Sequence, residues 1–325
     1  MDEFISRRLG PELAEYAISS LVRGICAGDS KQVSVHFIAK YLHQLEQETG
    51  RITLGAARDW VRGWGRAAPK CPEEELDIVR RARAERWAIW GLENGLETLI
   101  ETLRDSVTSS GVEVRLGTAV EKVTRDGAGL RVVTGAEEVA CDEVVMAAPA
   151  FQTAGMVADL CPELAELLAA IPFVDVAVVN IEYRGRVLDH QGFGFLVPSS
   201  QPEPILGCIY DTCTFPQGNR TLLTVMVGGA WYRDMVGAAT EEEVGARAVA
   251  TVSRVLGISA APVRVHCAQL PRCIAQYTVG HTARLGRARE ILARHKLPLH
   301  LVGSSYDGPG INDTIMSAKL AVIRR

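Results

Sequence analysis

The sequence lacks the features that mark membrane-spanning and secreted chains. No apolar run approaches the roughly 20 residues that a transmembrane helix needs. The opening Met1-Asp2-Glu3 is acidic and does not begin a signal peptide, and Arg7 and Arg8 alone do not make an Arg-rich presequence. The formal net charge of -4 over 325 residues argues against nucleic acid as the main partner.

Motifs for metal binding and for covalent catalysis are also missing. The 8 cysteines form no C-x-x-C pair and no Cys/His cluster with metal-ligand spacing, which predicts reduced, mostly buried thiols and no metal site. There is no G-x-S-x-G, H-E-x-x-H or Walker loop, and no catalytic nucleophile–base pair can be assembled. His281, which stands alone, is interpreted as structural. An enzyme with this sequence would leave the chemistry to a cofactor.

A dinucleotide-binding fold opens with a strand, a G-x-G-x-x-G turn and a helix, and no such unit is present. The near match Gly63-Trp64-Gly65-Arg66-Ala67-Ala68 follows no strand, and prolines at 69 and 72 stop a helix, so we interpret it as a loop. It overlaps a segment, Arg58–Arg66, in which Arg and Trp alternate. That segment is either a membrane-interface element or an exposed basic loop.

What is present is enough apolar sequence, 47% of residues, for a substantial core. Periodicity predicts a helical first third, followed by a helix and short strands. The predicted helices are Pro11–Arg23, Val35–Leu45, Glu73–Trp90 and Gly95–Ser109, and the strands are Val112–Leu116, Val120–Val123, Leu130–Val133 and Glu143–Ala148.

The second half predicts an antiparallel sheet with one buried face and a return to alternating helix and strand. Thr240 and Glu243 form a capping-box pattern at the start of one helix. This order predicts an α/β fold of two interleaved domains. The predicted strands are Val174–Tyr183, Phe195–Pro198, Leu206–Tyr210, Leu222–Gly228 and Pro298–Val302, and the helices are Thr240–Leu256, Ala283–His295 and Ile311–Ile323.

The most informative local segment is Leu301–Asp313, in which a buried strand enters a glycine-rich loop and then a helix. Free N–H groups and the positive end of the helix dipole at such a junction suit the electron-rich edge of a flavin or a pyrophosphate. A plain strand–helix turn capped by Asn312 or Asp313 explains the segment equally well.

Longer segments carry a resemblance to a known family. The sequence resembles the animal protoporphyrinogen oxidases, of the flavin amine oxidase superfamily, in order along essentially the whole chain. The segments that carry the match are Asp2–Gly10, Arg23–Ser30, Gln191–Ser200, Cys273–His281 and Ser304–Ser317.

This resemblance implies an FAD enzyme of haem biosynthesis that converts protoporphyrinogen IX to protoporphyrin IX, with O2 as acceptor and hydride removal by the flavin. It implies a monotopic protein of the mitochondrial inner membrane that contacts membrane lipid, and a homodimer is possible. The alternative is an inactive, truncated isoform that lacks the FAD pyrophosphate site and acts only as a binding or membrane-associated protein. A third interpretation is another flavin amine oxidase or a carotenoid desaturase.

The resemblance also assigns site residues. Val120 matches the position whose backbone meets the adenine, and Pro309, Gly310 and Ile311 match the loop over the flavin. The positions that pack the tetrapyrrole are Phe193, Gly194, Leu196 and Met226, which could otherwise be ordinary core residues. No residue is assigned as catalytic, because the flavin carries the chemistry.

By the same resemblance the incomplete FAD-binding domain and the substrate domain alternate along the chain. The chain is expected to begin inside the family's helical, membrane-associated region, after the nucleotide-binding βαβ unit. The expected segments are 1–72, helical and membrane-associated; 73–97, substrate domain; 98–156, FAD-binding domain; 157–296, substrate domain with the antiparallel sheet; and 297–325, FAD-binding domain.

Overall fold

A computed structural model describes residues 1–63, 77–87, 91–92 and 94–323. It divides into two compact units. The first unit contains residues 1–44, 120–133 and 137–325, and the second contains residues 45–119 and 134–136. The first unit thus assembles three separated stretches of chain. The division into FAD-binding and substrate segments remains a prediction.

The second unit is helical in its described part and includes the end of α4 (Lys40–Thr49). Helix α7 (Glu97–Ser109) confirms the prediction for Gly95–Ser109, and α6 (Asp77–Ala84) confirms the middle of the predicted helix Glu73–Trp90. The prediction is wrong beyond Ala84, where the chain turns and Arg86 takes a φ of 55°; residues 73–76 and 88–90 lie outside the described residues. α5 (Ile52–Gly63) was not predicted. Residues 64–68 of the G-x-G-x-x-G-like segment, and with them the end of Arg58–Arg66, lie outside the described residues.

The predicted strand Val112–Leu116 is wrong. The segment is irregular, and its apolar side chains Val112, Val114 and Leu116 are exposed. Alternating apolar residues form a stable strand only when a neighbouring strand and a buried face receive them. In the described part of the chain this segment has neither.

The first unit begins with α1 (Asp2–Leu9), a π-helix η1 (Leu13–Ile18), α2 (Ser19–Cys26) and α3 (Val35–Ile38). The predicted helix Pro11–Arg23 is therefore a π turn that continues into α2. The predicted helix Val35–Leu45 is likewise split into α3 and α4.

Within the described residues, no helix has both the length and the apolar character needed to cross a bilayer.

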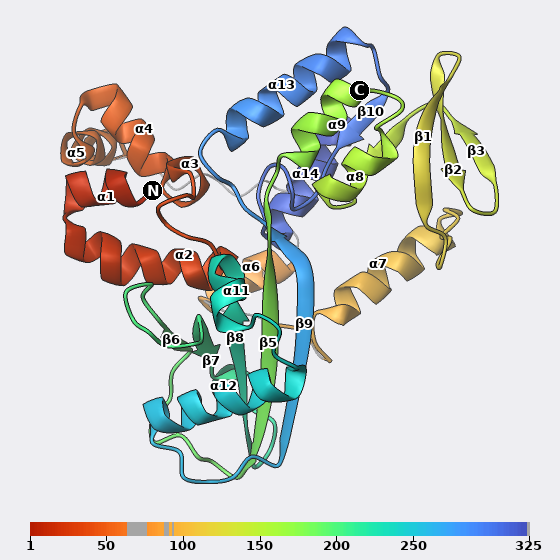
Figure 1. Ribbon diagram of the computed structural model, residues 1–325. Helices are drawn as coiled ribbons and strands as arrows, with labels where there is room; N and C mark the ends of the chain where they lie inside the picture. Colours follow the sequence, from red (N-terminus) through yellow and green to blue (C-terminus); the bar gives the residue numbers. More distant parts are fainter. Residues whose placement is uncertain (64–76, 88–90, 93, 324–325) are drawn as a thin grey trace. The chain divides into compact units, whose positions relative to one another are not determined.

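A parallel strand pair forms the α/β part of this unit. β4 (Val144–Met146) pairs with β10 (Leu299–Leu301), although about half the chain separates them. Figure 1 shows the helices that pack around the pair: α8 (Ala150–Met156), α9 (Pro162–Ala169), α13 (His281–Arg294) and α14 (Ile311–Ile323). A small antiparallel sheet adjoins them, formed by β1 (Val120–Asp126), β2 (Gly129–Thr134) and β3 (Glu138–Cys141).

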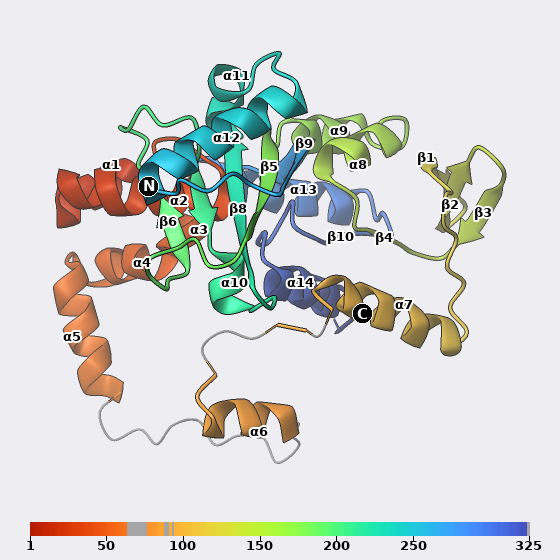
Figure 2. The ribbon, with the colours of Figure 1, turned by 90° about the horizontal axis from the view of Figure 1, so that it is seen from below.

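A five-stranded antiparallel sheet, in the order β6-β7-β8-β5-β9, forms the other part of the unit. α12 (Glu241–Leu256) covers one face, as Figure 2 shows, and the Thr240/Glu243 capping box is present as predicted. The long strand β9 was not predicted. The strands are β5 (Phe173–Arg184), β6 (Gly194–Leu196), β7 (Gly207–Ile209), β8 (Arg220–Gly228) and β9 (Arg264–Ala275), with short helices α10 (Asp211–Thr214), η2 (Gly229–Trp231) and α11 (Tyr232–Met235) between them.

The cysteines in the described residues are free thiols, as expected, and most are buried or half-buried. Burial raises the pKa of Cys26 to about 11 and that of Cys208 to about 12. Both thiols therefore stay protonated near neutral pH and act as small apolar groups in the core.

Candidate functional site

The first part of the site is the glycine-rich loop after β10. In the parallel pair, Leu301 lies opposite Met146, so β4 and β10 end at the same edge. Gly303 takes a φ of 106°, and a Cβ built there would lie 3.4 Å from the carbonyl oxygen of Ala147. The loop therefore passes close to the end of β4. Ligands of open α/β sheets bind in the crevice at the carboxyl ends of the strands.

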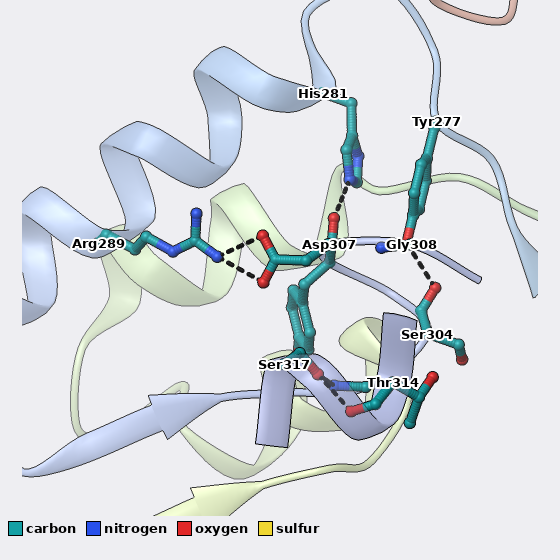
Figure 3. A network of polar contacts seen from close by, with 10 residues as sticks. Tyr277, His281, Arg289, Ser304, Asp307, Gly308, Thr314 and Ser317 are labelled. Atoms are coloured by element: carbon teal, nitrogen blue, oxygen red, sulfur yellow. Dashed lines mark hydrogen bonds and ion pairs between the residues drawn. The ribbon is translucent and has the colours of Figure 1, made fainter. Parts of the chain in front are cut away.

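Aromatic side chains from the segment after β9 hold this loop (Figure 3). The Tyr277 hydroxyl donates to the carbonyl of Ser304 at 2.8 Å and accepts from the N–H of Gly308 at 2.9 Å. The His281 ring stacks on Tyr277 with 4.2 Å between centroids, and its Nε2 donates to the carbonyl of Tyr306 at 3.0 Å. Two side chains thus bind three backbone groups of the loop.

His281 is structural, as the sequence predicted. Because a carbonyl can only accept, Nε2 carries the hydrogen, and Nδ1 is buried without a hydrogen-bond partner. Burial lowers the pKa of His281, so the ring is neutral at physiological pH.

Two further contacts fix the ends of the loop. Arg289 on α13 donates Nη2 to both carboxylate oxygens of Asp307 at 2.7 Å. The hydroxyl of Ser317 on α14 accepts from the N–H of Gly303 at 3.1 Å and donates to the carbonyl of Thr314 at 2.8 Å. The loop is therefore held from the segment after β9, from α13 and from α14 at once (Figure 3).

Pro309, Gly310 and Ile311 lead into α14, whose first N–H groups have no partner within the helix. Asp313 packs against Gly308 and Gly310 in the first helical turn. A carboxylate is therefore already present at this positive helix end. A second full charge such as a phosphate is disfavoured there, whereas the neutral, hydrogen-bond-accepting edge of a flavin ring fits.

Val120, expected near the adenine, begins β1 and is half-buried. It packs against the buried cluster that contains Tyr306 and that Leu301 also contacts. Val120 therefore belongs to the same packed core as the glycine-rich loop, residues 302–310, which we call the cofactor loop. Its contact with adenine remains a prediction.

The second part of the site is the face of the five-stranded sheet opposite α12. Leu223 and Val225 of β8 are buried in one cluster with Val244 and Val252 of α12, so these side chains point toward the helix. Because side chains alternate along a strand, Thr224 and Met226 point to the other face.

The register places Leu196 and Met226 in one row of that face. Leu196 pairs with Gly207, Gly207 pairs with Met226, and Met226 pairs with Val178. Leu196 and Met226 are thus two strands apart, or about 10 Å. Gly194 lies in the next row on the same face, opposite Ile209. The structure therefore brings together three of the four residues expected to pack a tetrapyrrole.

Phe193, the fourth, immediately precedes β6 and is 61% exposed. Its carbonyl accepts from the N–H of Tyr210 at 3.0 Å, which extends the β6–β7 pairing by one step. A phenyl ring this exposed is free to contact a ligand, whereas a core residue would be buried.

Helix α2 packs against the sheet residue Leu196. A Cβ at Gly24 would lie 2.5 Å from Cδ2 of Leu196, so only glycine allows this approach. The adjacent Arg23 is 1% exposed and donates to the carbonyls of Val197, Pro198 and Ile205 at 2.8, 2.6 and 3.3 Å. Its guanidinium also lies over the Trp231 ring, 4.6 Å from the centroid.

The segment after β9 connects the two parts of the site. Gln276 donates its side-chain N–H to the carbonyl of Cys26 at the end of α2, at 2.8 Å. The next residue, Tyr277, holds the cofactor loop. Sequence reasoning missed the roles of Arg23 and Gln276. The sequence does contain one signal for Arg23: a charged residue among the apolar residues of a predicted helix indicates a buried polar contact.

The sequence of residues 1–324 matches the family described as flavin containing amine oxidoreductase. The chain is 37% identical to protoporphyrinogen oxidase of Macaca fascicularis over 98% of its own length and 67% of the relative's, and 38% identical to that of Bos taurus over 99% and 67%. A solved Exiguobacterium structure, assigned as a protoporphyrinogen oxidase, superposes with a TM-score of 0.76 at 26% identity, covering 99% of this chain and 65% of the other.

The chain thus spans about two thirds of the length of the relatives it matches. The family match covers the cofactor loop and the sheet face together, and the residues at both places fit a flavin and an apolar ligand. The chain belongs to the flavin containing amine oxidoreductase family.

Proposed function

We propose that the chain acts in the FAD-dependent oxidation of protoporphyrinogen IX to protoporphyrin IX with O2, a reaction of haem biosynthesis. The similarity to relatives named protoporphyrinogen oxidase supports this proposal. The observation that carries the proposal is the row of Leu196 and Met226 on the sheet face opposite α12, beside α2. A flat, largely apolar macrocycle needs such a surface.

The residues of the chain bind and orient the substrate, since the described part offers no nucleophile–base pair. Leu196 and Met226 supply apolar contact, and Gly194, where a Cβ would lie 2.1 Å from the carbonyl oxygen of Cys208, lets β6 approach β7 closely. Tyr277 holds the cofactor loop in place. When bound, FAD supplies the capacity to take hydride equivalents from the tetrapyrrole and to pass electrons to O2.

The proposal includes a peripheral position on the mitochondrial inner membrane. Exposed apolar side chains on the first helices support it: Leu9, Leu13, Tyr16, Leu21 and Ile25. Such residues bind the interface between headgroups and acyl chains. Flotation with cardiolipin-containing vesicles tests this position, and sedimentation of the detergent-purified chain tests whether it forms a homodimer.

The activity is tested with the full chain purified in the presence of FAD. We expect a visible flavin spectrum and the appearance of porphyrin fluorescence when protoporphyrinogen IX is added. A colourless chain that takes up no FAD would contradict the proposal and favour a binding protein without turnover. Oxidation of an amine but not of the porphyrinogen would assign it to another branch of the family.

A matched pair of variants tests the sheet face. Met226→Gln places a polar group in the proposed substrate surface and should lower kcat/KM about tenfold, the effect of about 1.4 kcal/mol. Val255→Gln makes the same kind of change at an exposed position on α12, on the opposite side of the sheet, and should leave kcat/KM unchanged.

A further inference from the structure

A carboxylate lies at the sheet face opposite α12. Asp211 begins α10, directly after Tyr210, and is half-buried. In the described part of the chain it has no ion-pair partner, whereas Glu182 of β5, on the same face, pairs with Arg220 at 3.1 Å. A half-buried carboxylate without a cation partner is a candidate for a functional group.

Hydrogen bonds fix the position of this carboxylate. The Thr224 hydroxyl donates to Oδ2 of Asp211 at 2.8 Å, and the Asn180 side-chain N–H donates to the Thr224 hydroxyl at 2.9 Å. Asn180 and Thr224 lie opposite each other on β5 and β8, and both point away from α12. The chain Asn180–Thr224–Asp211 therefore runs across the exposed face and orients one carboxylate oxygen.

The carboxylate lies beside the residues proposed to pack the macrocycle. Thr224 is two residues from Met226 on the same face, or about 7 Å along the strand. It also shares a row with Gly194, through Ile209. Asp211 is thus hydrogen-bonded to Thr224, which lies in the same row as Gly194. This row is next to the row of Leu196 and Met226.

A porphyrinogen offers hydrogen-bond donors that suit such a group. All four of its pyrrole nitrogens carry hydrogens, so the centre of the macrocycle only donates hydrogen bonds. An entirely apolar surface would leave these donors unsatisfied, which costs binding energy. Desolvation raises the pKa of Asp211, which makes its carboxylate a better proton acceptor than an exposed one.

We propose that the Asp211 carboxylate accepts a hydrogen bond from the pyrrole N–H groups of the tetrapyrrole and receives a proton that an N–H group loses on oxidation. In one two-electron step a C–H bond of the macrocycle loses hydride to the flavin, and an N–H bond loses its proton to Asp211. The N–H electron pair stays in the ring as a new C=N bond, and Asp211 then returns the proton to water. This inference rests on the proposed function.

Binding of an analogue that cannot be oxidised tests the inference without turnover. A water-soluble sulfonated calixpyrrole keeps the four N–H donors of a porphyrinogen, but its fully substituted meso carbons cannot lose hydride. Its affinity is compared with that of protoporphyrin IX, which has half as many N–H donors. Three proteins are measured by fluorescence titration: the wild-type chain, Asp211→Asn, and Asp189→Asn, the same change at an exposed loop residue.

We expect Asp211→Asn to weaken calixpyrrole binding about tenfold to a hundredfold, as for loss of one charge-assisted hydrogen bond, and to change protoporphyrin binding less than about threefold. Asp189→Asn should change neither. With FAD bound, kcat should fall more than KM rises in Asp211→Asn.

Two results overturn the inference in different ways. If Asp211→Asn binds both tetrapyrroles as tightly as the wild type, Asp211 has no role at the pyrrole nitrogens, and the proposed function still stands. If the wild-type chain binds neither tetrapyrrole, the sheet face is not a tetrapyrrole surface, and the proposed function fails with it. Thermal melting of Asp211→Asn shows whether it is folded, and Asn retains an oxygen that accepts from Thr224.

Discussion

Replacing Arg23 with methionine should lower the free energy of unfolding by about 3–5 kcal/mol, because three carbonyls lose their donor. Arg23 is 1% exposed, and its guanidinium group donates to three carbonyls of the segment between β6 and β7. Each buried carbonyl left without a donor costs about 1–3 kcal/mol. Relief of the guanidinium desolvation, which lowers the pKa of Arg23, offsets part of this loss.

Thermal melting of the purified chain measures the effect. A loss of this size should lower Tm by on the order of 10 °C. Arg23→Lys should recover less than half of the loss, because an ammonium group lacks the planar fork that reaches three acceptors. Since Arg23 also fixes α2 beside Leu196, KM for the tetrapyrrole should rise in both variants.

The control is Arg254→Met, which removes an exposed arginine paired with Glu203 on the surface. Exposed ion pairs contribute little, so its stability should stay within about 0.5 kcal/mol of the wild type. If Arg23→Met and Arg254→Met have the same Tm, the buried guanidinium does not hold α2 to the sheet, and the reasoning from its hydrogen bonds is refuted.

Three further predictions concern the cofactor loop and the backbone. Tyr277→Phe removes the hydroxyl that binds two backbone groups of the loop and should weaken FAD binding about tenfold, measured by quenching of flavin fluorescence; an unchanged affinity would show that the loop is held without it. Gly229→Ala should cost about 3 kcal/mol or more, because the new Cβ would overlap the carbonyl of Ala27 at a φ of 63°. Gly286→Ala on α13, where nothing lies within 4 Å, should instead stabilise by about 0.5–1 kcal/mol, and equal melting temperatures would contradict the packing described. Burial lowers the folded-state pKa of His281, so its contribution is present above the ordinary value of about 6.5 and is lost as pH falls below it. Tm should therefore fall from pH 7 to pH 5 in the wild type and fall less in His281→Gln.

Several parts of this fold could be predicted from local sequence. α14 has the predicted bounds Ile311–Ile323, and the Thr240/Glu243 capping box begins α12 as expected. These features depend on residues a few positions apart, so the sequence pattern contains the relevant contacts. The segment Val112–Leu116 failed because its apolar alternation required a partner strand that local pattern cannot supply.

The family also followed from sequence, because the matching segments extend in order along the chain. The assignment of Leu196 and Met226 to a ligand surface depended on that resemblance, since each could equally have been a core residue. The register of β6, β7 and β8 then placed both side chains on the face opposite α12.

The order of residues was sufficient for the family and for the glycine-rich loop before α14. Which residues meet in space became known only from the folded chain. The donors of Arg23 reach carbonyls about 175 residues away, and Asp211 reaches the sheet face through Thr224. Hydrogen bonds between distant segments depend on strand register and helix packing, and neither is encoded in the neighbouring residues.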